Sequence, residues 1–114
     1  RLRVEWDMDG VSPGTRVPPL VLQPLLENAI YHGIEPLPGG GLIRVTGVVQ
    51  GGMVEVTITN PVSGQAAGGS EGNRIAQDNI HQRLLLAFGA GAGLEASRSG
   101  EVYRVCIRFP ETQP

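Results

Sequence analysis

Two polar side chains on an otherwise apolar helix are the first residues whose types and spacing could do chemistry. Asn28 and His32 lie one helical turn apart in the segment 21–33. The segment's apolar residues recur at spacings of three and four, which predicts an amphipathic helix ending at Gly33. These residues are Val21, Leu22, Leu25, Leu26, Ala29 and Ile30. A surface helix would carry Lys and Glu at the two polar positions, so an amide and an imidazole predict a helix that flanks a site.

A third polar residue, Asn60, ends an apolar strand. Val54, Val56 and Ile58 are predicted to face inward, and the same parity brings Asn60 to that face. An amide at the end of such a row is either a satisfied structural group or a hydrogen-bonding group that reads a ligand.

Each of these signals has a plainer alternative. Taken singly, Asn28 would be a helix cap or surface amide, and His32 a helix-end histidine near free carbonyl groups. Asn60 before a proline would be a turn residue. Asn79 and Arg83, four residues apart, would form a solvated pair on a helix face.

Length and charge limit the classes of protein that fit. The 114 residues predict a single domain, 1–114, with its own core. The net charge is -2 and the basic residues are scattered, which argues against a nucleic-acid partner. A single cysteine, Cys106, and no long apolar run lead us to expect a soluble domain of a reducing compartment, without membrane contact of its own. Because residue 1 already falls in a strand-like pattern, we expect a piece of a longer protein.

The remaining patterns predict the order strand, helix, hairpin, long loop, helix, hairpin. The first strand alternates apolar and charged residues, with Leu2, Val4, Trp6 and Met8 on a buried face. The predicted strands are 1–8, 42–50, 53–59, 94–98 and 101–109, and the predicted helices are 21–33 and about 75–88. Two helices covering one face of a mostly antiparallel five-stranded sheet make a two-layer α+β sandwich.

At residues 22–33 the sequence Leu-Gln-Pro-Leu-Leu-Glu-Asn-Ala-Ile-Tyr-His-Gly closely resembles the N box of LytS/AlgZ-type sensor histidine kinases. These kinases share an ATPase superfamily with gyrase, Hsp90 and MutL. Residues 78–84 resemble the family's second glycine box where it runs into a helix, and the closing hairpin is similar too. The resemblance covers nearly the whole chain and implies a histidine-kinase catalytic domain that binds ATP and Mg²⁺.

The resemblance also implies roles for individual residues. Asn28 matches the asparagine that binds the Mg²⁺ bridging the ATP phosphates, and a neutral oxygen ligand suits this hard cation. Asn60 stands where relatives have an Asp that accepts a hydrogen bond from the adenine amino group. Gly64 keeps the second glycine of the first glycine box, and the loop 62–76 is implied to cover the phosphates. The further nucleotide-binding candidates are His32, Gly72, Arg74, Asn79 and Arg83.

Several positions depart from the family pattern. Tyr31 stands where many relatives carry a Lys or Arg toward the phosphates, and Val62 replaces the first glycine of its box. Arg74 and Ala76 occupy the usual glycine places of the second box, where side chains hinder bare backbone amides from meeting anionic oxygens. Pro24 takes the place of the gyrase-type general base, so efficient hydrolysis by water is not expected. The alternatives are a weak or conditional kinase, and a degenerate module that contacts proteins without ATP turnover.

For the intact protein, the resemblance implies transfer of the ATP γ-phosphoryl group to a histidine on a dimerisation domain outside this chain. The implied partners are that phosphoacceptor domain and a cognate response regulator. A homodimeric parent in the inner membrane, with this domain in the cytoplasm, is also implied. An anti-sigma-type serine kinase of the same superfamily fits less well, because the second-box helix and the final hairpin look LytS-like.

Overall fold

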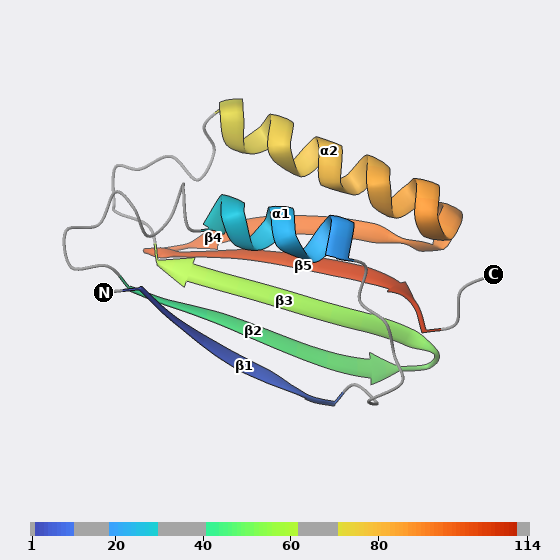
Figure 1. Ribbon diagram of the computed structural model, residues 1–114, viewed down its shortest axis with the longest axis horizontal. Helices are drawn as coiled ribbons and strands as arrows, with labels where there is room; N and C mark the ends of the chain where they lie inside the picture. The colour runs from blue at the N-terminus through green and yellow to red at the C-terminus, as the bar shows by residue number, and fades with distance from the viewer. Residues whose placement is uncertain (1, 11–18, 30–40, 62–70, 112–114) are drawn as a thin grey trace.

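The computed structural model describes residues 2–10, 19–29, 41–61 and 71–111, which form a five-stranded sheet covered on one face by two helices (Figure 1). The sheet order is β1-β2-β3-β5-β4. The strands are β1 (Leu2–Gly10), β2 (Gly41–Gln50), β3 (Met53–Pro61), β4 (Gly93–Ser99) and β5 (Val102–Pro110). The helices are α1 (Pro19–Ala29) and α2 (Glu71–Phe88), and the 3-10 turn η2 (Gly89–Gly91) follows α2. The predicted two-layer α+β sandwich is confirmed.

The strand pairing is mixed but mostly antiparallel, as predicted. β2 pairs with β3, β3 with β5, and β5 with β4, all antiparallel, whereas β1 runs parallel to β2. The β2–β3 hairpin turns on Gly51 and Gly52, whose φ angles of 58° and 82° lie in the left-handed region that glycine adopts without steric cost.

The core lies between the sheet and the helices because α1 packs on β3 and α2 packs on β4 and β5. Alternate residues of each central strand point into this layer and are buried. The buried apolar residues of the three central strands are Ile43, Val45, Val54, Val56, Ile58, Val105, Ile107 and Phe109, and those of the helices are Leu25, Ala29, Ile80, Leu84 and Phe88. None of the described helices is long and apolar enough to cross a membrane.

Helix α2 begins at Glu71, four residues before the start predicted from the sequence. The prediction relied on apolar periodicity, which starts only at Ile75 and gives no signal for a first turn without apolar residues. As a consequence, Gly72 and Arg74 lie in the first turn of a regular helix and not in the predicted loop 62–76.

Strand β1 also differs from its prediction in length and in burial. It continues to Gly10 through an irregularity of register after Asp7, and a Cβ at Gly10 would lie only 2.7 Å from the carbonyl oxygen of Gly47. The prediction of a half-buried apolar face is wrong for Val4 and Trp6, which are 37% and 53% exposed. The physical reason is that β1 lies at the sheet edge, whereas the helices pack over the strands from β3 to β4.

Candidate functional site

Three chain segments that carry candidate residues meet at one end of the sandwich. Figure 1 shows the C-terminal end of α1, the C-terminal end of β3 and the N-terminal end of α2 at the same end of the molecule. The backbone of Asn28 lies in the last turn of α1, and Asn60 is the second-last residue of β3. We call this region, defined by Asn28, Asn60 and Glu71, the Asn60 end.

Asn60 is the best-defined side chain of this region. It is 4% exposed and continues the buried row of β3, as the strand parity predicts. Its Nδ2 donates a hydrogen bond to the carbonyl oxygen of Pro61 at 3.0 Å. Because a carbonyl oxygen can only accept, this contact fixes which side of the amide carries the nitrogen and leaves Oδ1 as the group that can accept from another donor.

Two further polar residues lie near Asn60, where α2 packs on β5. Tyr103 of β5 lies directly opposite Asn60 in the antiparallel register, so the two side chains share the helix-covered face. Gln77 of α2 is 8% exposed, and its Nε2 donates a hydrogen bond to the Tyr103 hydroxyl. Asn60, Tyr103 and Gln77 therefore form a polar cluster at the margin of an apolar core, where unpaired polar atoms would be costly.

A double-mutant cycle should measure the hydrogen bond between Gln77 and Tyr103. We expect Tyr103→Phe and Gln77→Leu each to lower the free energy of unfolding, and the double variant to lose about 1 kcal/mol less than the sum of the two. The cycle is needed because Gln77 takes part in a further interaction besides this hydrogen bond. Urea denaturation gives the four values, and strictly additive losses would contradict a direct bond.

The other predicted site residues are not gathered into this cluster. Asn79 and Arg83 lie on the exposed side of α2, away from the buried row of Ile80 and Leu84. Gly72 and Arg74 lie in the first turn of α2. The remaining candidates, His32, Gly64 and the side chain of Asn28, lie outside the described residues. Their roles, and those of Asn79 and Arg83 toward phosphate, stay predictions.

Sequence reasoning missed Gln77 and Tyr103 as members of the site. Gln77 precedes the buried residues Ile80 and Leu84 by three and seven positions, so helical periodicity places it on the inner face. Tyr103 lies two residues before the buried Val105, so strand alternation places it on the same face of β5. No sequence signal pairs the two residues, because they are separated by 26 positions and only the fold brings them together.

The opposite face of the sheet is polar and carries shallow hollows. One hollow of about 250 Å³ lies against β2, β3 and β5 at the Asn60 end. Its lining residues are Leu42, Arg44, Thr59, Asn60, Pro61 and Val102. Arg44 and Arg108 on this face form ion pairs with exposed or half-exposed carboxylates, which contribute little to stability.

The fold defines the class of domain that this chain resembles. No protein-family profile matches the chain. A histidine kinase domain of the Erythrobacter litoralis EL346 blue-light-activated histidine kinase superposes with a TM-score of 0.64 at 24% identity, over 96% of this chain and 55% of that one. Histidine kinase ThkA, solved in complex with the response regulator protein TrrA, superposes with a TM-score of 0.60 at 15% identity, over 97% of this chain and 34% of that one. The fold is thus that of histidine kinase catalytic domains.

Sequence comparison leads to named relatives. The chain is 31% identical over 108 residues to the sensor histidine kinase YpdA of Escherichia coli K12, covering 88% of this chain and 19% of that protein. It is 32% identical over 114 residues to the sensor histidine kinase YesM of Bacillus subtilis 168, covering 96% of this chain and 20% of that protein. The chain therefore spans about a fifth of the length of these curated relatives, and its sequence homologues are sensor histidine kinases.

Proposed function

We propose that this chain is the ATP-binding catalytic domain of a LytS/AlgZ-type sensor histidine kinase. It binds Mg²⁺ and ATP and transfers the γ-phosphoryl group to a histidine outside residues 1–114. One observation carries the proposal. In the fold of histidine kinase catalytic domains, the turn of α1 that bears Asn28, the buried Asn60 and the start of α2 meet at one end of the sandwich.

The described chemistry of Asn60 fits an adenine site. With Nδ2 donating to the Pro61 carbonyl, Oδ1 is the acceptor, and an exocyclic amino group of adenine is a matching donor. Low exposure strengthens such a bond and penalises a base that cannot make it. Asn60 therefore selects the base, and Tyr103 lies opposite it in the register with its hydroxyl bonded to Gln77.

Asn28 fits a magnesium site by the chemistry of its side chain. A neutral amide oxygen is a suitable ligand for a hard cation that keeps several waters and binds phosphate oxygens as well. When bound, the metal neutralises charge on the phosphates during phosphoryl transfer. Pro24 lies one turn before Asn28 in α1 and has no acid or base group, so this helix supplies no general base there for water. Transfer to a protein histidine fits this arrangement better than hydrolysis.

In the intact protein, the partners of this domain are its own phosphoacceptor domain and a cognate response regulator. The complex of ThkA with TrrA supports a response-regulator partner for a kinase of this fold. We further propose a homodimeric, membrane-anchored parent with this domain on the cytoplasmic side of the inner membrane. These properties belong to the part of the protein beyond residues 1–114.

A second candidate is a degenerate module that docks proteins without ATP turnover. The observation that favours it is the early start of α2, which places Gly72 and Arg74 in a regular helix. Main-chain amides of a flexible glycine loop can wrap phosphates, whereas the free amides in the first turn of a helix all point along the helix axis. A titration with an ATP analogue separates the two candidates.

The test is a titration of the chain with a non-hydrolysable ATP analogue, with and without Mg²⁺, followed by amide shifts and melting temperature. We expect Mg²⁺-dependent stabilisation that grows with the logarithm of ligand concentration. No response to a millimolar excess would refute nucleotide binding and leave the degenerate module.

Substitution of Asn28 by alanine should abolish the Mg²⁺ dependence while binding without metal persists. Gln23→Ala is the matched control, because Gln23 is exposed on the same helix and bonds only a surface carboxylate, Glu27, among the described contacts of its side chain. If Asn28→Ala keeps the full Mg²⁺ dependence, Asn28 is not the metal ligand.

A further inference from the structure

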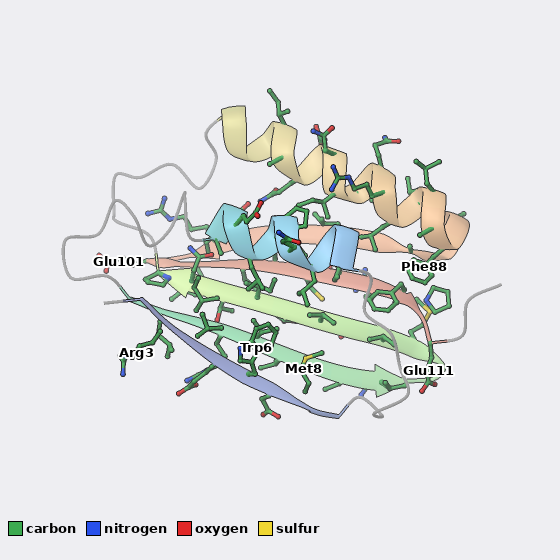
Figure 2. All side chains as sticks on the ribbon, viewed as in Figure 1. Arg3, Trp6, Met8, Phe88, Glu101 and Glu111 are labelled. Carbon is green, nitrogen blue, oxygen red and sulfur yellow. The ribbon has the colours of Figure 1, made fainter. Side chains whose placement is uncertain are left out.

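Strand β1 presents apolar side chains along an open sheet edge. β1 is the last strand of the sheet, so one side of its backbone has no strand partner among the described residues. Val4 and Trp6 are 37% and 53% exposed, although their register neighbours on β2, Ile43 and Val45, are fully buried. Figure 2 shows Trp6 and Met8 on the helix side of β1 and Arg3 on the other side. An exposed edge with an apolar row is a template for strand pairing.

Strand β1 carries a positively charged residue before Glu5 and a negatively charged residue after it. Arg3, Glu5 and Asp7 alternate with the apolar row and point to the open face of the sheet. Glu5 is held by Arg44 of β2, whose Nε lies 3.0 Å from its Oε1. Arg3 and Asp7 have no ion pair within the described residues. Among the described side chains of β1, Arg3 and Asp7 thus carry one positive and one negative charge outside any ion pair, each two residues from Glu5.

Two copies of β1 are complementary when they pair antiparallel about a two-fold axis through Glu5. Arg3 of each copy then faces Asp7 of the other, and Val4 faces Trp6, so unlike charges meet on one side and apolar groups on the other. The two Glu5 carboxylates approach each other on the axis, where each keeps its own Arg44. This cluster of two carboxylates and two guanidinium groups has no net charge.

Other registers are less favourable. A shift of the axis by half a residue would place apolar side chains opposite charged ones, because the side-chain period of a strand is two. An axis through Trp6 would put Glu5 of one copy opposite Asp7 of the other, which is a like-charge pair. An axis through Val4 would put Arg3 opposite Glu5, which Arg44 already holds.

We propose that the β1 edge is a homodimerisation surface, through which two copies of this domain join their sheets into one. The occupant of the edge is a second β1, in antiparallel register about Glu5. A short edge pairing buries less surface than a standard interface, so the dimer of isolated domains is weak and concentration-dependent. It becomes strong when the domains are held close together, since tethering raises their effective concentration.

Three single-cysteine variants test the register on a Cys106→Ser background. Glu5→Cys should form a disulfide-linked dimer fastest, because a residue on the axis faces its own copy with a Cβ separation of about 5 Å, near the disulfide range. Val4→Cys and Trp6→Cys should link slowly. Faster linkage of either would overturn the proposed register. No linkage in all three, together with monomers at the highest soluble concentration in sedimentation, would overturn the dimer.

Charge reversal tests complementarity on the uncrosslinked chain. Arg3→Asp and Asp7→Arg should each weaken association about tenfold, since each variant creates two like-charge pairs per dimer. The double variant should restore association, because the charges again face opposite signs. Glu101→Arg is the control, because it reverses a negative charge as Asp7→Arg does, at an exposed position in the β4–β5 turn. It should leave association unchanged. A double variant as weak as the single ones would overturn the register.

Trp6 provides a direct readout. It is the single tryptophan of the chain, so its fluorescence reports the edge alone. We expect a blue shift as chain concentration rises, in parallel with sedimentation, because Val4 of the second copy covers the indole. A spectrum that stays constant while dimers form would place the interface elsewhere. Unchanged melting temperatures of the variants at low concentration separate lost association from lost folding.

Discussion

Replacing Phe109 by alanine should lower the free energy of unfolding by about 3–5 kcal/mol. Phe109 is 1% exposed and stacks on Phe88 with ring centroids 4.9 Å apart and planes inclined by 25°. It also lies opposite Val54 in the register of β3 and β5. The substitution therefore opens a cavity at the point where the end of α2 meets two central strands. Since a domain of this size has a total stability of about 5–15 kcal/mol, a large share would be lost.

Two controls make the Phe109 result specific. Leu86→Ala removes a large apolar side chain that is 87% exposed and should change stability by less than about 0.5 kcal/mol. Phe109→Leu keeps much of the volume and should be less damaging than alanine. Urea denaturation with a constant slope gives all three values. If Phe109→Ala matched Leu86→Ala, the packing of α2 against β5 described above would be incorrect.

The second large effect is expected for Asn60→Asp, which restores the acid that the resemblance implies at this position. The substitution places a carboxylate oxygen against the Pro61 carbonyl in a site that is 4% exposed. It exchanges a hydrogen bond for a repulsion between two acceptors and buries a charge. We expect a loss of about 2–4 kcal/mol at neutral pH.

The loss should shrink in acid. Burial raises the pKa of the new carboxyl above its unfolded value, so the folded state binds more protons between the two pKa values and gains stability as the pH falls through this window. A protonated carboxyl can also donate to the Pro61 carbonyl. Asn79→Asp is the matched control, because it makes the same change on the exposed side of α2. Equal, pH-independent losses in both variants would contradict the described environment of Asn60.

Most of the sheet could be predicted from local sequence patterns. The Gly51-Gly52 pair requires positive φ angles, and the alternating row that ends at Asn60 has one apolar face, so the turn, the register and the buried side of this hairpin follow together. The second hairpin follows for the same reasons. The fold class then results from packing two amphipathic helices on the single apolar face.

Burial at the edge could not be predicted in the same way. The alternation of Val4 and Trp6 with charged residues is the pattern of a half-buried strand. This pattern contains no information on how far the helices extend across the sheet. The first turn of α2 was missed because it carries no apolar period. The exposure of the edge strand and the start of α2 were therefore determined by tertiary packing and not by the local sequence pattern.

The candidate site was predicted only in part. Asn60 lies at the buried end of β3, as its parity required, whereas its partners Gln77 and Tyr103 depend on contacts between distant segments. Asn28 belongs to α1 as predicted, and its role as a magnesium ligand depends on the titration described above. Binding of a nucleotide is a property of several segments together, and the patterns within one segment do not determine it.

The parallel pairing of β1 with β2 has a thermodynamic consequence for the helix that bears Asn28. Two parallel neighbours cannot be joined by a tight turn, so β1 and β2 need a crossover connection, and α1 is the described part of that connection. Closing the chain between β1 and β2 costs loop-closure entropy, which the packing of α1 on β3 offsets. Substitutions that loosen α1 therefore also weaken the attachment of β1, and the helix proposed to hold the metal is the same helix that keeps the edge strand in the sheet.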